Sequence, residues 1–455
     1  MDNISFTKIS PFWKTKASIN DPLTFFKAID QKGEFCKYKG ILSFIYLGNP
    51  SLVKQVFDKT GTHYNKVNPL YDRFRFILGQ GMLTSEGKIW RDQKRSFSPF
   101  FSKSNINKFL PIIFRKLSKT FKRWEEHAKS SRPIDLSEEF FNLTLNVIGE
   151  LVLSYDFNDN FKEIKEITNI FNEYVAGPSI PFFSSPNIPT PFNIKVKKAR
   201  KRFLKIIKTI IEKRISSKER KEDLLQLIID KNPKEVTPLI LDQILSLIIA
   251  GHETTSNALV WTFYHLSKNK REKEKLQTLL DENIKGDFPS FQEIQKLGYV
   301  RQVINESLRL SPPVWLITRK SIKEDTLGGQ RIKPGQMIIF SPYFLHRKEE
   351  YWENPLEFKP DRFSDSNKLE KHTFLPFGSG PHACIGASLS MMEMSIFLTA
   401  LVRAFDWSNI TPFPSPFLSF TMGAKAGPLI ILKKRKAKSA SFNKNLEYSQ
   451  ELIRQ

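Results

Sequence analysis

A glycine-rich loop near the end of the chain contains one of its two cysteines, Cys384. Gly378, Gly380 and Gly386 flank it, and glycine lets a backbone turn tightly and approach a flat ligand. A helical pattern begins directly after the loop, so amides at its N-terminus would point toward the sulfur and favour its anionic form. A thiolate held in this way can be an axial ligand of iron. Taken alone, however, a cysteine among glycines is more typical of a structural residue in a turn.

A second polar stretch, Ala250–Thr255 (AGHETT), interrupts a long apolar helical pattern. Glycine and paired threonines are poor choices for the centre of a helix, and a buried Glu253 is costly unless it is hydrogen-bonded or protonated. Broken local rules in an otherwise consistent helix indicate a functional site, although a polar patch facing solvent would give the same pattern. His252–Glu253 also begins a zinc-hydrolase motif, but Ser256 stands where this motif needs its second histidine. We therefore reject a zinc hydrolase.

Phe377, Gly380, His382, Cys384 and Gly386 stand at fixed offsets that resemble the cysteine-loop signature of the cytochrome P-450 family. Four further stretches resemble motifs of this family in the right order, namely Trp90–Arg95 (tryptophan–arginine motif), Ala250–Thr255 (oxygen-activating helix), Glu306–Arg309 (Glu-x-x-Arg pair) and Lys359–Phe363 (Pro-x-Arg-Phe segment). A lone Glu-x-x-Arg pair is common on helix surfaces, but all five motifs in order are not expected by chance. The resemblance covers nearly the whole chain and implies a haem-thiolate monooxygenase of a soluble, bacterial-like type.

The resemblance implies haem b as the cofactor and Cys384 as the protein ligand of its iron. It also implies that Thr254 is the hydroxyl beside bound dioxygen, and that Glu253 is the acid that feeds protons to it. Ala250 and Gly251 would lie against the distal haem face, where small side chains leave room for oxygen. The structural alternative for Thr254 is a hydrogen bond to a carbonyl of its own helix.

Haem propionates need cationic or hydrogen-bonding partners when they are buried, and the match to the family gives Trp90, Lys94, Arg319 and His382 as candidates. The full set of cofactor-binding residues implied by the resemblance is Trp90, Lys94, Ala250, Gly251, Arg319, Phe377, Gly380, His382 and Gly386. Lys94 and His382 stand where the family commonly has arginine, so both lose the bidentate fork of a guanidinium. A neutral loop histidine is the alternative for His382.

Glu306 and Arg309 are three residues apart and would share one helix face, so they can pair. A third charged group would let the carboxylate and guanidinium satisfy each other in a buried position. The resemblance identifies this group as Arg362. It implies that the triad locks the fold around the cysteine loop and takes no part in redox chemistry.

The helical and strand patterns of the segments that must position these residues predict a mainly α fold with a minor β part. The resemblance implies one large domain with a long central helix that crosses the haem. The central helix is expected from Thr237 to Leu266, about 30 residues and roughly 45 Å long. Further segments predict helices at Pro22–Gly33, Asn105–Ala128, Leu136–Leu153, Lys195–Ile215 and Asp223–Asp230, and strands or a hairpin at Lys39–Leu47, Met337–Phe340 and Pro428–Leu432. The proline-rich connection Gly177–Phe192 is expected to be irregular, and such long connections are often functional lids.

The chain has 455 residues, of which 40% are hydrophobic, enough to bury a large core. Two cysteines do not make a secreted disulfide scaffold, so we expect a reduced, cytoplasmic protein. No apolar run has the length of a signal peptide or transmembrane segment, and Leu239–Ala250 is too short to span a bilayer. Residues 1–432 are expected to form the haem-thiolate catalytic domain. Residues 433–455 are expected to form a basic tail, too short for a flavin or iron–sulfur module.

The formal net charge of +24 and the pI of about 9.7 indicate either an anionic partner or a lysine-rich solvated surface. The basic residues are spread along the chain without a nucleic-acid motif, so we expect no nucleic-acid partner. Electrons must then come from a separate protein. The resemblance implies an acidic ferredoxin- or flavodoxin-type donor that docks over the cysteine loop.

The sequence therefore predicts a monooxygenase that inserts one atom of dioxygen into an apolar substrate such as a fatty acid, terpenoid or steroid. The alternative is a haem-thiolate sensor or carrier without turnover, but mere gas binding needs no proton relay such as Glu253–Thr254. The resemblance draws the substrate pocket from Val67–Met82, Gly177–Phe192, Ile248–Ala250, Val314–Ile317 and Phe420–Met422. These segments are aromatic and aliphatic, which leaves the choice among apolar substrates open.

Overall fold

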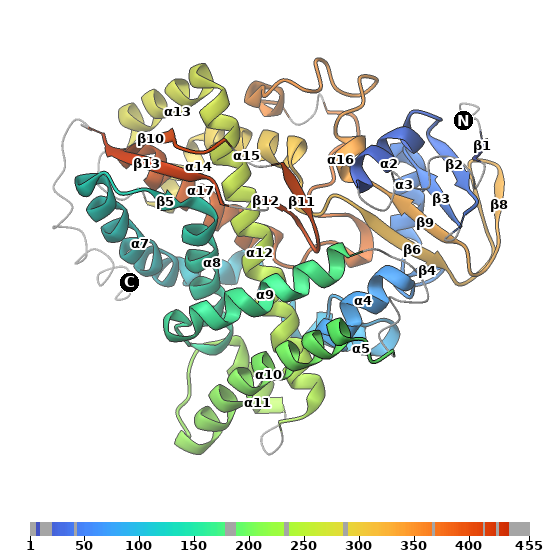
Figure 1. Ribbon diagram of the computed structural model, residues 1–455, viewed down its shortest axis with the longest axis horizontal. Coiled ribbons are helices and arrows are strands. Elements are labelled where there is room, and N and C mark those ends of the chain that lie inside the picture. Colours follow the sequence, from blue (N-terminus) through green and yellow to red (C-terminus); the bar gives the residue numbers. More distant parts are fainter. Residues whose placement is uncertain are drawn as a thin grey trace.

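The computed structural model describes residues 6–9, 21–40, 43–177, 188–231, 236–284, 290–365, 369–412, 415–424 and 427–435. Within these ranges the protein is mainly helical with a minor β part, which confirms the predicted class (Figure 1). Helices fill the left and lower parts of Figure 1. The largest sheet lies at the right, beside the N-terminal helices α2 (Pro22–Asp30) and α3 (Pro50–Asp58).

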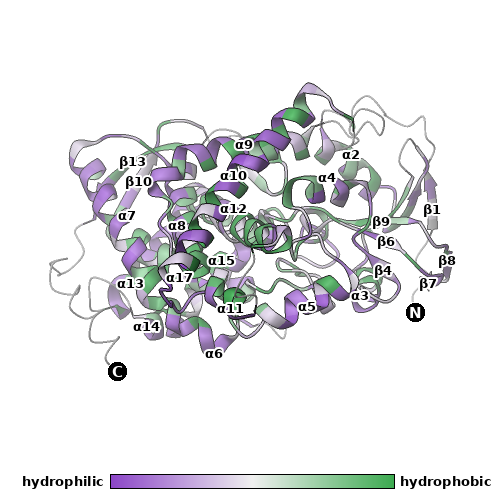
Figure 2. Ribbon diagram, turned by 90° about the horizontal axis from the view of Figure 1, so that it is seen from below, coloured by the Kyte–Doolittle hydropathy of each residue, from purple (hydrophilic) through white to green (hydrophobic). Residues whose placement is uncertain are grey.

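The longest described helix, α12 (Pro238–Lys268), lies in the middle of the molecule with other helices around it (Figure 2). Thr237 caps it by accepting a hydrogen bond from the amide of Ile240 at 3.3 Å, and Pro238 occupies its first turn. Most of its side chains are buried, as expected for a helix that crosses the core. The predicted start is confirmed, and the helix continues two residues beyond the predicted end at Leu266.

The other described α-helices are α4 (Pro69–Leu78), α5 (Gly87–Phe97), α6 (Lys103–Ile106), α7 (Leu110–Ser130), α8 (Leu136–Leu153), α9 (Phe161–Ala176), α10 (Pro191–Ser217), α11 (Leu224–Lys231), α13 (Lys270–Asn283), α14 (Phe291–Lys296), α15 (Gly298–Leu310), α16 (Pro342–Leu345) and α17 (Ala387–Ala404). The bounds of α8 are those predicted. The predicted helix Asn105–Ala128 is divided before α7, because Pro111 lacks the N–H that a continuous helix would need. α10 begins earlier than the predicted Lys195, since Thr190 caps it by accepting from the amide of Asn193 at 3.1 Å.

The proline-rich connection predicted for Gly177–Phe192 lies between α9 and α10. Its last two residues, Pro191 and Phe192, belong to the first turn of α10. Residues 178–187 are outside the described residues, so the predicted lid stays a prediction.

The largest sheet contains six strands in the order β1-β2-β3-β9-β6-β4. Their bounds are β1 (Phe6–Ile9), β2 (Phe35–Tyr38), β3 (Phe44–Leu47), β4 (Tyr64–Asn65), β6 (Ile317–Ser321) and β9 (Met337–Phe340). β2 and β3 are antiparallel and pair Phe35 with Leu47. The predicted hairpin at Lys39–Leu47 thus exists, but its first strand lies before Lys39, because Phe35 and Cys36 are fully buried there. β9 has the predicted bounds.

The smaller sheets lie elsewhere along the chain. One has three strands in the order β10 (Phe405–Asn409), β13 (Leu429–Lys434) and β5 (Ile134–Asp135). A second pairs β11 (Pro416–Leu418) with β12 (Met422–Ala424), and a third pairs β7 (Asp325–Leu327) with β8 (Gln330–Ile332). β13 continues two residues beyond the predicted strand end at Leu432, and Arg435 forms an ion pair with Asp281 at 2.7 Å. Residues 436–455 are outside the described residues, so the boundary of the basic tail stays a prediction.

Of the described helices, α17 alone is long and apolar enough to cross a membrane by its composition. Most of this helix, 72%, is buried inside the protein, where it packs against α12, α13 and α15. Its apolar surface therefore serves the core of the fold.

Candidate active site

The cysteine loop is a tight turn that ends at the N-terminus of α17. Gly378 and Gly380 have φ angles of 67° and 69°, a region that side-chain-bearing residues rarely adopt. A Cβ on Gly380 would also lie 2.5 Å from the carbonyl oxygen of Phe57, so only glycine fits there. The amide of Cys384 donates to the carbonyl of Phe377 at 2.9 Å, which closes the loop on itself.

Cys384 lies in this loop, three residues before the first residue of α17. The residue is accessible to solvent, yet burial among protein atoms raises the pKa of its thiol, while the backbone N–H of Gly386 opposes this shift. The expected stabilisation of the anion by the helix N-terminus is thus outweighed by burial. A bound metal cation deprotonates a coordinating thiol, and this would supply the missing stabilisation.

Cationic side chains converge beside the loop. Lys94 donates to the carbonyl of Pro381, and the Trp90 ring lies 3.9 Å from the His382 ring. Burial, together with the positive charges of Lys66, Arg319 and Lys94, lowers the pKa of His382 to about 2. This shift favours the neutral ring, and both ring nitrogens of His382 are buried without a hydrogen-bond partner among the described residues, so its contact with a propionate stays a prediction.

Arg319 is almost fully buried on β6, and only one of its guanidinium nitrogens has a described partner, the carbonyl of Thr318 at 2.9 Å. Its Nε is buried without a partner in the part of the chain that the structure describes. Buried cations and unpaired donors at one place are costly without an anionic ligand. The two propionates of a haem would supply such anions, so these residues fit the cofactor.

Sequence reasoning missed Lys66, which belongs to no motif. It is 4% exposed and donates to the carbonyl of Leu83 at 2.9 Å. Burial lowers its pKa to about 7, an effect that Glu86 opposes and Arg319 reinforces. An anion beside Lys66 would restore its charge, so Lys66 joins the candidate propionate partners.

The AGHETT turn lies in the middle of α12. Thr254 donates its hydroxyl proton to the carbonyl of Ala250 at 2.8 Å, which is the structural alternative considered for this residue. The hydroxyls of Thr255 and Ser390 are 3.0 Å apart and join this turn to the first turn of α17. The AGHETT turn therefore lies beside the start of α17, the helix that follows the cysteine loop directly.

Two residues of the AGHETT turn serve packing. A Cβ on Gly251 would lie 2.8 Å from Cγ1 of Ile148 on α8, so glycine lets the two helices approach closely. The buried His252 contacts the Phe141 ring at 4.6 Å, and its Nδ1 lies 2.6 Å from the carbonyl of Ile248. Burial lowers the pKa of His252 to about 4, so it is neutral near pH 7. The predicted contact of Gly251 with haem stays a prediction.

Glu253 is held by two side chains that no motif indicated. Its Oε1 accepts hydrogen bonds from Nδ2 of Asn172 and from the hydroxyl of Thr421, both at 2.9 Å. Thr421 in turn accepts from Nδ2 of Asn257 at 2.8 Å. Burial raises the pKa of Glu253 to about 7, although Thr421 and Asn172 oppose the shift. The other oxygen, Oε2, is buried without a partner among the described residues, so this acid can hold a proton near neutral pH.

We expect Glu253 to make stability depend on pH. Because its pKa is near 4.5 in the unfolded chain and about 7 when folded, the native state keeps a proton that the unfolded state releases. The stabilising contribution is complete below pH 4.5 and is lost as pH rises to 7, by up to about 3 kcal/mol. Urea unfolding of the wild type and Glu253→Gln between pH 5 and 8 should show the wild type losing stability relative to the variant. A constant difference would contradict the raised pKa.

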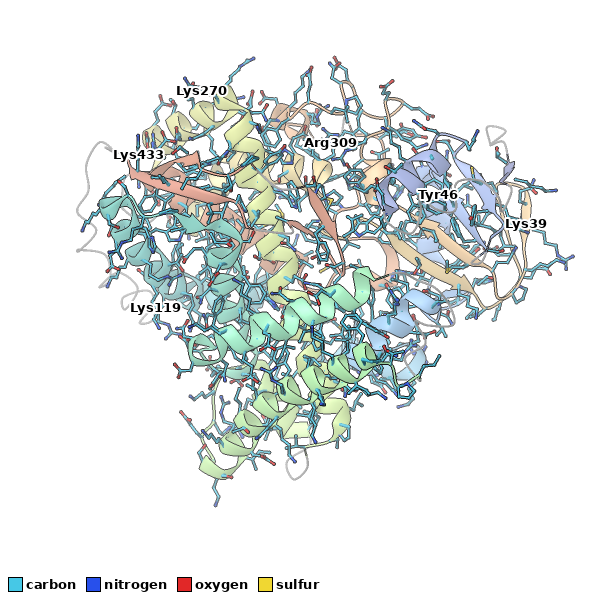
Figure 3. The ribbon with its side chains drawn as sticks, viewed as in Figure 1. Lys39, Tyr46, Lys119, Lys270, Arg309 and Lys433 are labelled. Atoms are coloured by element: carbon cyan, nitrogen blue, oxygen red, sulfur yellow. The ribbon has the colours of Figure 1, made fainter. Side chains whose placement is uncertain are left out.

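Glu306, Arg309 and Arg362 form a hydrogen-bonded triad. Figure 3 labels Arg309, which lies on α15. Glu306 and Arg309 are fully buried, with Arg309 Nε 2.7 Å from Oε2 and Nη2 2.8 Å from Oε1 of Glu306. Arg362, in the 3-10 turn η3 (Pro360–Phe363), donates its Nε to Oε1 at 3.0 Å. The structure thus brings together the three residues that the sequence proposed. The carboxylate of Glu306 accepts hydrogen bonds from both arginines.

The triad is linked to the cysteine loop through a buried histidine that the sequence analysis did not identify. Arg309 Nη1 donates to the carbonyl of His346 at 2.8 Å, and Nε2 of His346 accepts from the amide of Leu375 at 2.9 Å. Leu375 stands two residues before Phe377. Burial lowers the pKa of His346 to about 3, so the ring stays neutral and its Nε2 can act as an acceptor. Through these contacts Arg309 holds His346, and His346 holds the backbone directly before the cysteine loop.

The buried cations and unpaired donors beside the loop of Cys384 fit a haem-binding protein. The family model for cytochrome P450 matches residues 22–430 of the chain. The chain therefore belongs to the cytochrome P450 family. It is a haem-containing monooxygenase that uses dioxygen, an organic substrate and electrons from a redox partner.

Curated relatives agree with this assignment. Cyclooctatin synthase from Streptomyces melanosporofaciens is 29% identical over 424 residues, which cover 90% of each chain. Cyclooctat-9-en-7-ol 5-monooxygenase from the same organism is 28% identical over 420 residues, covering 89% of this chain and 88% of the relative. Carotene epsilon-monooxygenase of Arabidopsis thaliana is 27% identical over 413 residues, covering 85% and 76%.

Proposed function

We propose that the protein is a haem b monooxygenase that hydroxylates an apolar terpenoid, with Cys384 as the iron ligand. The observation that carries the site assignment is the contact between Thr255 and Ser390, which sets the oxygen-activating turn of α12 beside the start of α17, directly after the cysteine loop. Lys66, Lys94, Trp90, Arg319 and His382 would hold the propionates in this arrangement. When bound, the haem supplies an iron centre that reduces dioxygen.

The residues of α12 would deliver protons to that centre. Glu253 is buried and carries a pKa of about 7, so it exchanges a proton near neutral pH without a large free-energy cost. Thr254 follows it directly, and its hydroxyl would accept and donate protons once it leaves the carbonyl of Ala250. Asn172 and Thr421 hold the carboxylate of Glu253 in place, which makes them positioning residues.

Replacing Thr254 with alanine tests this role. We expect Thr254→Ala to keep substrate binding but to lower the product formed per electron consumed by about tenfold, because protons no longer reach oxygen in order. The remaining electrons should appear as peroxide or water. Thr262→Ala offers a matched control, since its hydroxyl also bonds the carbonyl four residues earlier, at 2.7 Å, two turns farther along α12. An unchanged ratio in Thr254→Ala would remove it from the relay.

The proposal of a terpenoid substrate rests on the relatives and on the apolar segments near the site. Carotene, in the name of one relative, is a long terpenoid hydrocarbon. Two of the predicted pocket segments meet in the structure, where the Phe74 and Phe420 rings stack with centroids 4.6 Å apart. Titration of the haem spin state with cyclic diterpenes and with fatty acids distinguishes the candidate classes. A response to fatty acids alone would reject the terpenoid assignment.

We propose an acidic ferredoxin- or flavodoxin-type protein as the electron donor. α5 presents Lys88, Arg91 and Arg95 on its exposed surface, and its Lys94 touches the cysteine loop through Pro381. This positive surface would meet an acidic partner over the thiolate side of the haem. We also propose a cytoplasmic location, because both cysteines are free thiols, as is usual in a reducing compartment.

Charge reversal at Arg95 should slow the association of an acidic donor by about fivefold at low salt and leave the maximal reduction rate nearly unchanged. Added salt should have a similar effect on the wild type, since ions screen such attraction with a Debye length of about 8 Å at physiological salt. Stopped-flow reduction of Arg95→Glu measures both rates. Lys270→Glu on α13, far from α5 in Figures 1 and 2, is the matched control. A salt-independent rate would contradict electrostatic docking.

A further inference from the structure

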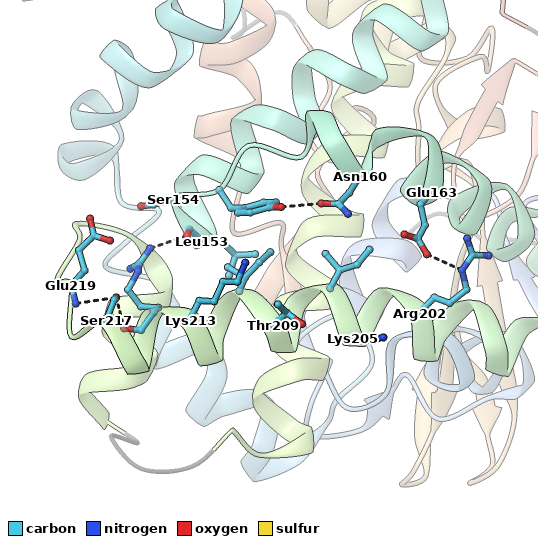
Figure 4. A pocket seen from close by; sticks show the side chains of 14 residues that line it. Leu153, Ser154, Asn160, Glu163, Arg202, Lys205, Thr209, Lys213, Ser217 and Glu219 are labelled. Carbon is cyan, nitrogen blue, oxygen red and sulfur yellow. Dashed lines mark hydrogen bonds and ion pairs between the residues drawn. The ribbon is translucent and has the colours of Figure 1, made fainter.

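A cavity of about 620 Å³ lies outside the candidate active site. It is formed by the end of α8, the start of α9 and the second half of α10, and none of its lining residues belongs to the motifs discussed above (Figure 4). The ion pair between Arg202 and Glu163, at 2.8 Å, closes one end. Ser217, whose hydroxyl accepts from the amide of Glu219 at 3.3 Å, lies at the other end.

The cavity carries positive charge without matching negative charge. Its two carboxylates are already paired, Glu163 with Arg202 and Glu219 with Lys221 at 3.2 Å. Lys205 and Lys213 also line it, and neither forms an ion pair with any described residue. Two solvent-exposed ammonium groups thus lie beside this cavity with no carboxylate partner in the described part of the chain.

Arg214 adds an unpaired buried donor to the same cavity. Its side chain is 6% exposed, and Nη2 donates to the carbonyl of Leu153 at 2.9 Å and pairs with Asp223 at 2.9 Å. Nη1 is buried without a hydrogen-bond partner among the described residues. A buried guanidinium nitrogen in this state is costly unless a ligand accepts from it.

The helix that supplies these residues is unusually basic on its outer face. Seven lysines of α10 are exposed, namely Lys195, Lys197, Lys198, Lys201, Lys205, Lys208 and Lys213, and Glu212 is the only acidic residue of the helix. Lys197 and Lys201, and then Lys201 and Lys205, stand four residues apart, a spacing at which like charges repel and destabilise a helix. Solvent ions screen part of this repulsion, and an anion bound at Lys205 would reduce it further.

The lining of the cavity is partly apolar, because Leu153, Tyr155, Ile206 and Ile210 contribute to it. The hydroxyl of Tyr155 donates to Oδ1 of Asn160 at 3.0 Å. An inorganic anion would make no use of such a surface, whereas a hydrocarbon chain would be removed from water on it.

We propose that this cavity is a second binding site, for an amphiphile with an anionic headgroup and an apolar chain. Lys205 and Lys213 bind the headgroup, Nη1 of Arg214 donates to it, and the chain lies against Ile206 and Ile210. The inference is independent of the substrate proposed above. The same chemistry belongs to a free amphiphile and to an anionic bilayer lipid, and the experiment separates the two.

Calorimetric titration of the haem-loaded protein with dodecyl phosphate, at concentrations below micelle formation, tests the site. An azole ligand first occupies the iron, so that the active site is filled. We expect binding that Lys205→Gln/Lys213→Gln weakens by about tenfold or more. Lys198→Gln/Lys201→Gln removes the same charge from exposed positions of α10 outside the cavity and should change the affinity by less than about twofold.

Two partial ligands test the chemistry of the proposed occupant. Dodecanol lacks the charge and inorganic phosphate lacks the chain, so each should bind at least about tenfold more weakly than dodecyl phosphate. Equal affinity in the two double variants, or binding of phosphate as tight as that of dodecyl phosphate, would overturn the proposal. The unfolding midpoints of the two double variants should be equal, so that a difference in their affinities reflects the binding site and not a loss of stability.

Co-sedimentation with vesicles identifies the source of the amphiphile. If vesicles with phosphatidylglycerol retain the protein through Lys205 and Lys213, and vesicles of phosphatidylcholine alone do not, the site takes a bilayer lipid. If dodecyl phosphate binds but vesicle retention does not depend on these lysines, the site takes a free amphiphile. If neither dodecyl phosphate binding nor vesicle retention depends on Lys205 and Lys213, the proposed site is wrong.

Discussion

Replacing Cys384 with serine is expected to abolish the strongly red-shifted ferrous carbonyl band that a cysteine thiolate produces. A serine hydroxyl ionises far less readily than a thiol, and burial at this position already disfavours the anion. The loop itself should persist in the variant, because the Cys384 amide bonds to Phe377 through the backbone. The reduced carbonyl spectrum of the purified variant measures the effect. Retention of the band would mean that another group ligates the iron.

Cys36 provides the matched control, because it is the other cysteine of the chain. It is fully buried on β2, and its Sγ lies 3.1 Å from the carbonyl of Gly33 as a donor. Burial raises its pKa to about 11, so it remains a neutral thiol. Cys36→Ser should therefore leave the carbonyl spectrum unchanged.

Glu306→Gln is expected to destabilise the fold by about 3–5 kcal/mol and to reduce haem incorporation, because it leaves two arginines facing a neutral side chain. Arg309 is fully buried, and its remaining bonds go to main-chain carbonyls such as those of His346 and Pro355 at 2.8 and 2.7 Å. Disturbing Arg309 would also disturb the contact of His346 with Leu375 ahead of the cysteine loop. Urea unfolding and the ratio of haem to protein measure the two effects.

Glu324→Gln is the control for the triad, since Glu324 also pairs with an arginine, Arg331, at 2.6 Å. Both side chains of that pair are more than half exposed, so water replaces the lost partner and stability should not change measurably. A Glu306→Gln protein with normal haem content and an unchanged unfolding midpoint would rule out a structural role for the triad.

Local patterns in the sequence determined the helical part of the fold and the motifs of the site. Apolar periodicity with Thr237 and Pro238 at its start predicted the central helix, and α8 has the predicted bounds. Such features depend on neighbouring residues, so they can be derived from the sequence alone. The predicted bounds were wrong where neighbouring residues give no clear signal for the start of an element. The first strand of the N-terminal hairpin precedes Lys39, because burial in the sheet rather than a turn signal sets its position.

The sequence by itself identified the family, and it predicted the loop cysteine, the acid–hydroxyl pair of α12 and the members of the triad, because family motifs consist of residues at fixed spacing. Only the tertiary structure decided which distant residues surround them. Lys66 lies close enough to His382 to lower its pKa, Asn172 and Thr421 hold Glu253, and His346 joins the triad to the loop. Asn172 and Thr421 lie 81 and 168 residues from Glu253. Periodicity records which face of a helix is apolar, but the partner of a buried polar group depends on how whole elements pack together.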